Sequence, residues 1–143
     1  MDEFQIQVTD QPAETDWLWL EDKINQFNME MTGYHDYRPL AILIRNPVGA
    51  VIAGLTAFTW GGTLRILVLW VHENWRRHGL GTRLLATAEQ EARTRGCKQA
   101  IVETHSFQAP EFYPQRGYSA CGLTDDYPVG YQYFAFQKRL NEH

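Results

Sequence analysis

The feature that most constrains the fold is a short loop containing Gly79 and Gly81, between an apolar run and an amphipathic pattern. The run Thr63–Val71 is typical of a strand, and apolar side chains recur at helical spacing over residues 84–92. A strand–loop–helix unit directs several backbone N–H groups and the positive end of a helix dipole at one point. Glycine lets an anion approach the backbone closely. The pattern predicts a phosphate or pyrophosphate cradle, although a simple turn would also use these glycines.

Composition limits the class of protein. The 143 residues suit a single domain, and the formal net charge of −4 argues against nucleic acid as a partner. The sequence contains neither an apolar run of membrane-spanning length nor a basic leader, so we expect a cytoplasmic protein with no membrane partner. Cys97 and Cys121 lack disulfide or zinc spacing, so both are expected reduced at the edge of the core, with no metal site.

The first forty residues predict a strand, a helix and a loop. Phe4–Val8 alternates apolar and polar residues, which predicts a half-buried strand. Apolar residues at helical spacing over Trp17–Phe27 predict a helix, capped by Thr15 or Asp16. The polar and aromatic segment Asn28–Pro39 is expected to form a mobile loop or a broken second helix.

Three strands are predicted next, over Leu40–Ile44, Ala50–Trp60 and Thr63–Val71, with Gly61-Gly62 as a hairpin turn. The last of these is apolar on both faces, which predicts a central position in a covered sheet. Strict alternation puts Leu64, Ile66, Val68 and Trp70 on one face, and Leu67, Leu69 and Val71 on the other.

The helix after the glycine loop should end at Gly96, with Arg93 and Arg95 near its negative end. The strand Gln99–Glu103 then follows a crossover long enough for a parallel pair with Thr63–Val71. The remaining elements are a short or irregular helix from Pro110, a strand from Gly117, an acidic loop over Thr124–Gly130 and a last strand over Tyr131–Phe136.

Two motifs in this order of elements resemble a known family. The first motif is Arg76-x-x-Gly79-x-Gly81, which matches the pattern Arg/Gln-x-x-Gly-x-Gly/Ala. The second covers residues 106–118 and reads Ser-x-x-Ala-x-x-x-Tyr-x-x-x-Gly-Tyr. It is similar to the pattern Asn-x-x-Ala-x-x-x-Tyr with Gly-Phe or Gly-Tyr four residues later. Both are similar to signatures of the GNAT superfamily of N-acetyltransferases. Ser106 replaces the usual asparagine, and its hydroxyl can make one hydrogen bond to the cofactor but reaches less far than an amide.

The resemblance implies one N-acetyltransferase domain over residues 1–143 with an α/β (α+β) GNAT fold. Its central sheet is mixed, mostly antiparallel and of about six to seven strands, with a splayed parallel pair at the centre and helices on both faces. Acetyl-CoA (coenzyme A) is the implied donor, with its pantetheine arm between the strands ending near Val71 and Glu103. The implied cofactor-binding residues are Leu69, Trp70, Val71, Arg76, Arg77, His78, Gly79, Leu80, Gly81, Thr82, Thr104, Ser106, Ala109, Phe112 and Arg116.

The implied reaction is direct attack of a primary amine on the thioester, with Tyr113 as general acid. A purely structural Tyr113, packed like Phe112, is the alternative. The general base is unassigned, because the strand Thr63–Val71 contains no carboxylate. Its candidates are His35, Asp36, His72, Glu73, Glu103, His105 and a chain of water molecules.

Specificity is expected from the segment Asn28–Pro39, Trp60, Trp70 and the region Tyr127–Tyr133, where aromatic and acidic residues would suit a cationic amine. Candidate substrate residues are Tyr34, Asp36, Trp60, Trp70, Glu103 and His105. The candidate acceptors are a polyamine-like metabolite, an aminoglycoside-like drug, an amino acid, and the N-terminal or lysine amine of a protein. A homodimer is expected by analogy. The competing functions are a non-catalytic acyl-CoA sensor and, more weakly, a nucleotide-binding domain, for which the full glycine motifs are missing.

Overall fold

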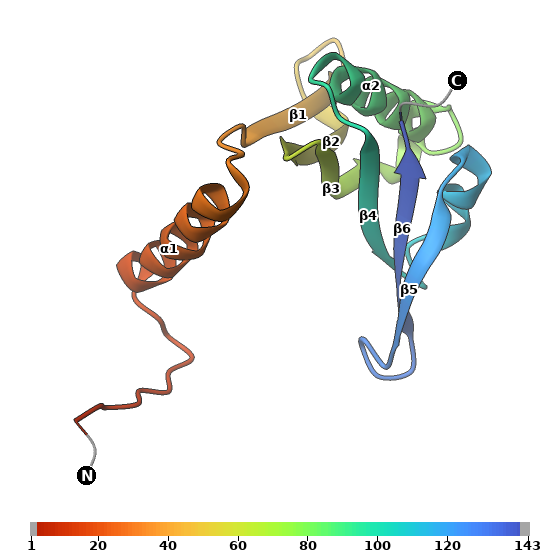
Figure 1. Cartoon of the computed structure of the whole chain (residues 1–143). Coiled ribbons are helices and arrows are strands. Elements are labelled where there is room, and N and C mark those ends of the chain that lie inside the picture. Colours follow the sequence, from red (N-terminus) through yellow and green to blue (C-terminus); the bar gives the residue numbers. More distant parts are fainter. Residues whose placement is uncertain (1–2, 141–143) are drawn as a thin grey trace. The chain divides into compact units, whose positions relative to one another are not determined.

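The computed structural model describes residues 3–140, which form two units, one up to His35 and one from Asp36 onward (Figure 1). The first unit contains helix α1 (Glu14–Thr32) after an irregular N-terminal segment. The predicted strand over Phe4–Val8 is wrong, because these residues pair with no strand within the described chain. A polar–apolar alternation creates a strand only where a neighbouring strand completes its hydrogen bonds.

Helix α1 begins earlier and ends later than its apolar pattern predicts. Its N-cap is Ala13, which provides no side-chain cap, and the predicted caps Thr15 and Asp16 lie inside the first turn. There the Asp16 carboxylate is favourable to the helix dipole instead. The helix continues to Thr32 and ends at Gly33, whose φ of 76° allows the left-handed C-cap. The expected mobile loop or broken second helix over Asn28–Pro39 is therefore wrong for residues 28–32, which continue α1, and for residues 38 and 39, which begin the first strand.

The second unit is built on a six-stranded sheet of β1 (Arg38–Arg45), β2 (Val51–Trp60), β3 (Thr63–Val71), β4 (Gln99–His105), β5 (Ser119–Asp125) and β6 (Gln132–Arg139). Their order is β1-β2-β3-β4-β6-β5, and β3 and β4 form the one parallel pair of this sheet (Figure 1). The predicted mixed, mostly antiparallel sheet with a central parallel pair is confirmed.

A β-bulge at Leu67 divides β3 into two halves. Its partners on β2 change from Ala57↔Ile66 to Thr56↔Val68, so Leu67 has no partner in this register. The predicted faces are therefore wrong beyond Ile66. Val68, which was assigned to the face of Leu64 and Ile66, is exposed, as is Trp70, whereas Leu69 and Val71 pack against the core.

The parallel pair is short. β3 and β4 are paired only from Thr63↔Gln99 to Ile66↔Val102, and the bulge follows at once. Beyond this point β4 continues to pair with β6 and β3 with β2. The two central strands thus diverge and leave backbone groups of Leu67–Val71 without a strand partner on the β4 side.

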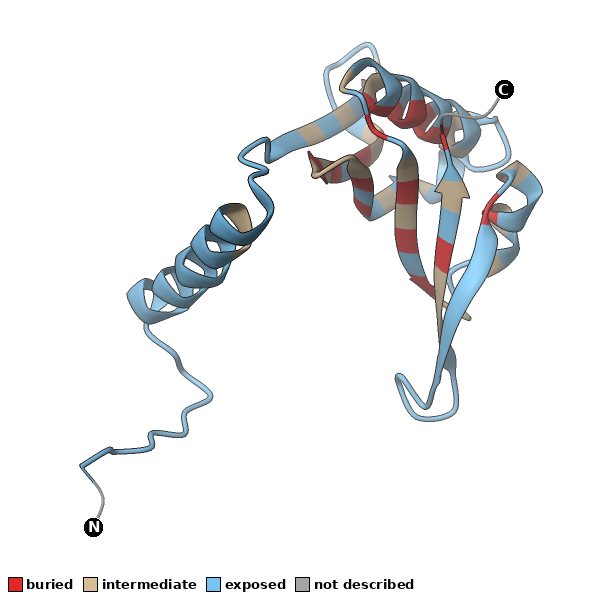
Figure 2. Ribbon diagram, viewed as in Figure 1, coloured by how far each residue is buried: buried red, intermediate tan, exposed pale blue. Residues whose placement is uncertain are grey.

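Helix α2 (Leu80–Thr94) packs on β1, β2 and β3. The core lies between them, and Figure 2 shows buried residues along the side of α2 that faces the sheet. Leu84, Leu85, Ala88 and Ala92 are all at most 2% exposed, which confirms the helical pattern. Cys97 is buried beyond the helix end, but Cys121 is exposed because β5 is an edge strand with no buried residue, so the prediction for Cys121 is wrong.

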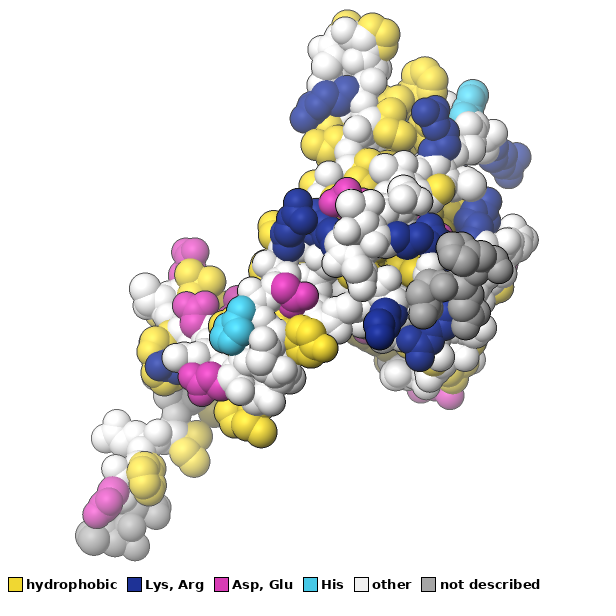
Figure 3. Space-filling model, turned by 45° about the horizontal axis from the view of Figure 1, so that its top comes forward, with side chains coloured by type: hydrophobic (Ala, Val, Ile, Leu, Met, Phe, Trp, Pro, Cys, Tyr) yellow, Lys and Arg dark blue, Asp and Glu magenta, His cyan; other side chains and the backbone are white. Residues whose placement is uncertain are grey.

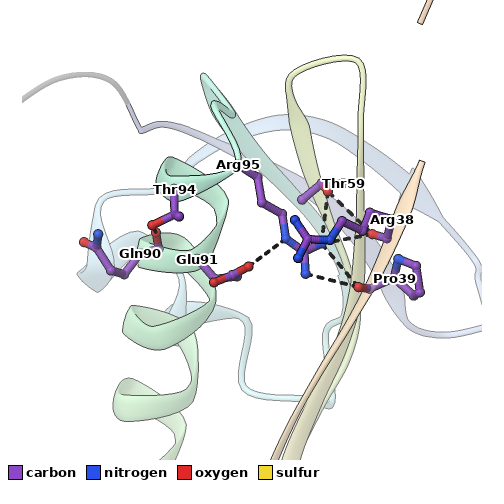
Figure 4. Close-up of polar contacts among 7 residues, drawn as sticks. All are labelled: Arg38, Pro39, Thr59, Gln90, Glu91, Thr94 and Arg95. Carbon is purple, nitrogen blue, oxygen red and sulfur yellow. Dashed lines mark hydrogen bonds and ion pairs between the residues drawn. The ribbon is translucent and has the colours of Figure 1, made fainter. Parts of the chain in front are cut away.

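Arg95 ties the C-terminal end of α2 to the β1–β2 edge of the sheet (Figure 4). Its guanidinium donates to the carbonyl oxygens of Arg38 and Pro39, to the hydroxyl of Thr59 and to the carboxylate of Glu91, over 2.8–3.2 Å. With its side chain only 9% exposed, Arg95 satisfies polar groups of two strands from one helix position.

Short 3-10 segments complete the unit: η1 (Glu73–Trp75), η2 (Pro110–Phe112) and η3 (Pro114–Arg116). The last two confirm the irregular helix expected from Pro110, since a second proline, Pro114, interrupts it. Across residues 3–140, no helix combines the length and apolar character needed to cross a membrane.

Candidate active site

The divergence of β3 and β4 opens a cavity of about 780 Å³. Its walls come from the second half of β3, the loop into α2, the end of β4 and the two 3-10 turns after it. They comprise Ile66–Val71, Trp75–Arg77, Gly79–Thr82, Val102–Thr104, Phe107–Ala109, Phe112, Tyr113 and Arg116. The carboxyl ends of the parallel strands thus meet the glycine loop at one place.

The glycine loop ends in an uncapped helix N-terminus. Gly79 is the N-cap in the left-handed conformation (φ 79°) and provides no side chain, so the first N–H groups of α2 have no side-chain acceptor. Arg77 is also left-handed (φ 65°). A Cβ built on Gly81 would lie 3.4 Å from the Phe112 ring, so this position holds the backbone close to the cavity wall. The loop is shaped to present donors to an anion.

Arginine side chains surround these donors. The Arg76 Nε donates to the carbonyl oxygen of Val71 at 3.0 Å, which fixes the loop against the end of β3. Arg116 donates to the Thr82 hydroxyl at 2.7 and 2.9 Å and lies 3.9 Å from the Phe112 ring centroid. Arg76, Arg77 and Arg116 all line the cavity, whereas Glu103 is the one acid that does so among the described residues.

The charge of the chain is unevenly divided between its two units. Residues 1–35 contain eight acids and one lysine, whereas residues 36–143 contain twelve basic and nine acidic residues. Figure 3 shows basic side chains spread over the visible face of the sheet unit. The unit that contains the cavity is therefore basic although the whole chain is acidic, which favours a phosphate-bearing ligand.

Tyr113 lies between η2 and η3 with its ring buried and lines the cavity. The ring packs against Phe112, Tyr118 and Phe136, at centroid distances of 5.2–5.8 Å. Within residues 3–140 every side-chain oxygen or nitrogen that is inaccessible to solvent has a hydrogen-bond partner. The Tyr113 hydroxyl has no such partner, so it is accessible, and it opens to the cavity that Tyr113 lines. Burial raises the pKa of Tyr113 to about 12, which keeps the phenol protonated at neutral pH.

The cavity brings together all but two of the fifteen predicted cofactor residues. His78 does not line it and instead packs near the ring of Trp75. Ser106 is occupied by β6, because its N–H donates to the Gln132 carbonyl and its hydroxyl accepts from the Gln132 N–H. The serine in place of asparagine thus serves to join β4 to β6.

The predicted substrate residues lie in different parts of the structure. Trp70 and Glu103 line the cavity, and His105 lies two residues beyond Glu103 at the end of β4. Asp36 accepts from the N–H of Gly61 at the β2–β3 hairpin. That hairpin joins the opposite end of β3, and it also carries Trp60.

The remaining candidates are divided between the two units. Tyr34 and His35 belong to the first unit. His72 Nδ1 accepts from the Asn74 N–H, and Glu73 lies in η1 beside it; neither lines the cavity. Of the six side chains considered as a base, Glu103 is the one that lines it.

Sequence reasoning missed several cavity residues, namely Ile66, Leu67, Val68, Trp75, Val102, Phe107 and Gln108. Phe107 and Gln108 lie inside the second motif, so its spacing could have indicated them. Leu67 and Val68 depend on the bulge, which strict alternation does not reveal. Gln108 also stabilises the turn after β4, since its side-chain oxygen accepts a 2.8 Å hydrogen bond from the His105 N–H.

Comparison with known proteins identifies the family. The model of the acetyltransferase (GNAT) family matches residues 3–118. The chain belongs to the GNAT acetyltransferase family. Acetyltransferase Atu2258 of Agrobacterium fabrum is 34% identical over 121 residues, which cover 85% of this chain and 88% of that protein. The blasticidin-S acetyltransferase of Streptomyces morookaense is 42% identical over 83 residues, covering 57% and 61%. A crystal structure from Agrobacterium tumefaciens has a TM-score of 0.89 at 31% identity, covering 95% and 99%.

This GNAT protein is an N-acetyltransferase, and the family's donor is acetyl-CoA. The cavity fits such a donor. The uncapped N-terminus of α2 and three arginines suit its phosphates. The unpaired edge of Leu67–Val71 suits a polar, extended arm, as a sheet edge suits an added strand.

Proposed function

We propose that this protein transfers the acetyl group of acetyl-CoA to a primary amine of a small molecule, with Tyr113 as the proton donor. The observation that carries this proposal is the open hydroxyl of Tyr113 in the wall of a cavity that also contains the N-terminus of α2. An anion cradle and a proton donor in one cavity are what a thioester-using transferase requires.

The residues of this chain have three tasks toward the donor. The N–H groups of residues 80–82, with Arg77 and Arg116, hold the phosphates. The edge of Leu67–Val71 orients the arm, and an N–H group there polarises the carbonyl of the thioester, an effect whose loss costs roughly 10²- to 10³-fold in rate. When bound, acetyl-CoA would supply a thioester: the neutral amine forms the new C–N bond and releases one proton to solvent, which later restores the proton donor. The C–S bond breaks, and its sulfur needs one proton.

Tyr113 provides that proton at its hydroxyl oxygen. The raised pKa of about 12 ensures that the phenol is protonated over the physiological range. The contacts with Tyr118 and Phe136 hold the ring in one orientation.

A small-molecule acceptor is favoured by the relatives. One relative is named a blasticidin-S acetyltransferase, and its 83 matched residues cover 57% of this chain. We extend only the class, a small amine, to this protein. The homodimer and the cytoplasmic location remain predictions from the sequence.

Two measurements test the proposal. Saturating acetyl-CoA should raise the melting temperature, as a ligand of the native state does, and the free-thiol signal should rise on addition of an accepted amine from a panel. Tyr113→Phe should lower kcat by about 10²-fold or more while the acetyl-CoA shift stays nearly unchanged. An unchanged kcat would remove Tyr113 from the mechanism. A thermal shift with no thiol release from any amine would favour the non-catalytic sensor.

A further inference from the structure

We propose that the acceptor is a cationic amine that carries a flat ring, bound by the carboxylate of Glu103 and by an aromatic cluster beside it. This inference rests on the proposed function, since it concerns the acceptor side of the same cavity. The aromatic cluster consists of His105, Phe107, Tyr127, Tyr131 and Tyr133.

The aromatic cluster is continuous although its members come from three separate segments. His105 ends β4 and stacks on Phe107 at a centroid distance of 5.0 Å and an interplanar angle of 18°. It also contacts Tyr133 of β6 at 4.5 Å and Tyr127 of the β5–β6 loop at 5.1 Å. Tyr131 extends the cluster through Phe107 at 5.2 Å.

Hydrogen bonds fix the cluster in place. The His105 Nδ1 lies 2.9 Å from the carbonyl oxygen of Tyr127, and because a carbonyl only accepts, this nitrogen carries the proton. The Asp126 N–H donates to the backbone carbonyl oxygen of Tyr131, and Ser106 exchanges two hydrogen bonds with the backbone of Gln132. The β5–β6 loop is therefore attached to the end of β4, and its rings form a fixed platform.

The platform is accessible. Phe107, Tyr127 and Tyr131 are 57%, 53% and 50% exposed, which is high for three neighbouring aromatic side chains. Packing needs of the core do not explain them, because none belongs to the core. Exposed rings grouped with Phe107, which lines the cavity, are suited to stacking against a planar ligand.

Glu103 supplies the charge beside this platform. It lines the donor cavity together with Phe107, and it lines an adjoining cavity of about 200 Å³ together with Tyr133. Burial raises the pKa of Tyr133, and the nearby Glu103 carboxylate raises it further. The Arg65 guanidinium lies 3.5 Å from the carboxylate, but both side chains are exposed by more than 40%, so water weakens this pair.

The combination specifies the ligand. A carboxylate attracts an ammonium group, and aromatic faces attract both cations and flat rings. The cavity proposed to hold acetyl-CoA adjoins Glu103 and the aromatic cluster. The ammonium group gives up one proton to solvent before it attacks the thioester as a neutral amine. Acetylation then leaves an uncharged amide, so the product loses the interaction with Glu103. The site thus distinguishes substrate from product by charge.

Three probes test this inference by ligand-observed NMR without acetyl-CoA and by thiol release with it. Tryptamine has both the charge and the ring, 2-cyclohexylethylamine has the charge without a flat ring, and N-acetyltryptamine has the ring without the charge. We expect tryptamine to bind at least about tenfold more tightly than either of the others. Equal binding of all three would overturn the inference, whereas loss of the acetyl-CoA thermal shift would instead overturn the proposed function.

Variants assign the effect to residues. Glu103→Gln should raise the KM for tryptamine about tenfold with a smaller change in kcat, and Phe107→Leu should reduce the preference for tryptamine over 2-cyclohexylethylamine several-fold. Arg65→Gln removes a competitor for Glu103 and should lower that KM about two- to fivefold, a gain that damage to the fold cannot produce. Glu111→Gln, at an exposed position that does not line the cavity, is the control. An unchanged KM in both Glu103→Gln and Arg65→Gln would exclude Glu103 as the anion.

Discussion

The hydroxyl of Tyr118 donates a 2.8 Å hydrogen bond to the buried carboxylate of Glu89. The other carboxylate oxygen accepts a 2.8 Å bond from the Lys138 Nζ of β6. This contact joins α2, the residue before β5, and β6 at one point. Because the Tyr118 ring packs edge-on against Tyr113 at 5.6 Å, the buried carboxylate also supports the wall of the donor cavity.

Glu89→Ala should lower the free energy of unfolding by about 2–4 kcal/mol, since it leaves Lys138 and the Tyr118 hydroxyl without their acceptor in a low-dielectric region. Urea unfolding measures the loss. Gln90→Ala, at the exposed neighbouring position of the same helix, should change stability by less than about 0.5 kcal/mol. Equal effects in the two variants would show that the buried carboxylate contributes no net stability.

Stability should fall in alkaline solution because of Tyr113. Its folded-state pKa of about 12 lies above the ordinary value of 10, so the unfolded chain releases this proton first. The contribution is complete below about pH 10 and is lost as the pH rises toward 12, by roughly 3 kcal/mol in all for a shift of two units. Unfolding free energies measured across this window should decline less steeply in Tyr113→Phe. Parallel curves for the two proteins would contradict this assignment.

Gly79 and Gly81 should respond differently to alanine. Gly79 has a φ of 79°, so Gly79→Ala should cost about 1–2 kcal/mol of stability through backbone strain alone, and Gly79→Asn should cost less. Gly81 has no such conformation, and its added Cβ meets the Phe112 ring at an ordinary contact distance, so Gly81→Ala should fold almost normally. Thermal unfolding of the three variants is the measurement. A Gly81→Ala protein less stable than Gly79→Ala would refute this ranking.

Arg95→Lys should destabilise the protein by about 2 kcal/mol, because an ammonium group cannot replace a planar fork that serves two carbonyls, a hydroxyl and a carboxylate. Hydrogen exchange should show the largest loss of protection in β1, which Arg95 connects to α2. Thr94→Ala, at the adjacent exposed position, is the matched control. Uniform loss of protection over the whole sheet would contradict a local role for Arg95.

The two thiols should differ in reactivity. Cys121 is exposed on the edge strand β5 and should react promptly with a thiol reagent. Cys97 is buried, and this burial raises its pKa, so its thiolate is scarce as well as inaccessible. Labelling of the native protein should modify Cys121 alone, and Cys121→Ser should abolish the fast phase. A fast phase that survives Cys121→Ser would show that Cys97 is accessible.

Local signals in the sequence predicted much of this fold. The bounds of β3 were predicted to the residue, because a double glycine begins the strand and a change in apolar pattern ends it. The strand over Phe4–Val8 failed for the opposite reason, since alternation says nothing about the presence of a partner. The bulge at Leu67 was also beyond local reasoning, because it exists only as an offset between two strands.

The candidate site shows the same division. The cofactor residues were predictable from motifs, since the Arg76–Gly81 loop and the turn before Tyr113 have fixed internal spacing. The aromatic cluster was indicated only as a composition, with aromatic residues over Tyr127–Tyr133. That His105 lies beneath them follows from the pairing of β4 with β6 over 27 intervening residues, in the register His105↔Tyr133. Pairing at such separation depends on the whole sheet.

The short pairing of β3 with β4 has a consequence for folding kinetics. β1-β2-β3 is a local meander, whereas the junction from Thr63↔Gln99 to Ile66↔Val102 closes a loop that contains all of α2. Contacts of long sequence separation form slowly, and β4 pairs over such separations with both β3 and β6, so we expect β1-β2-β3 and the β5–β6 hairpin to form first and β4 to join them afterwards. Strand β4 is then the last part of the sheet to become protected during refolding, and the cavity originates where it leaves β3.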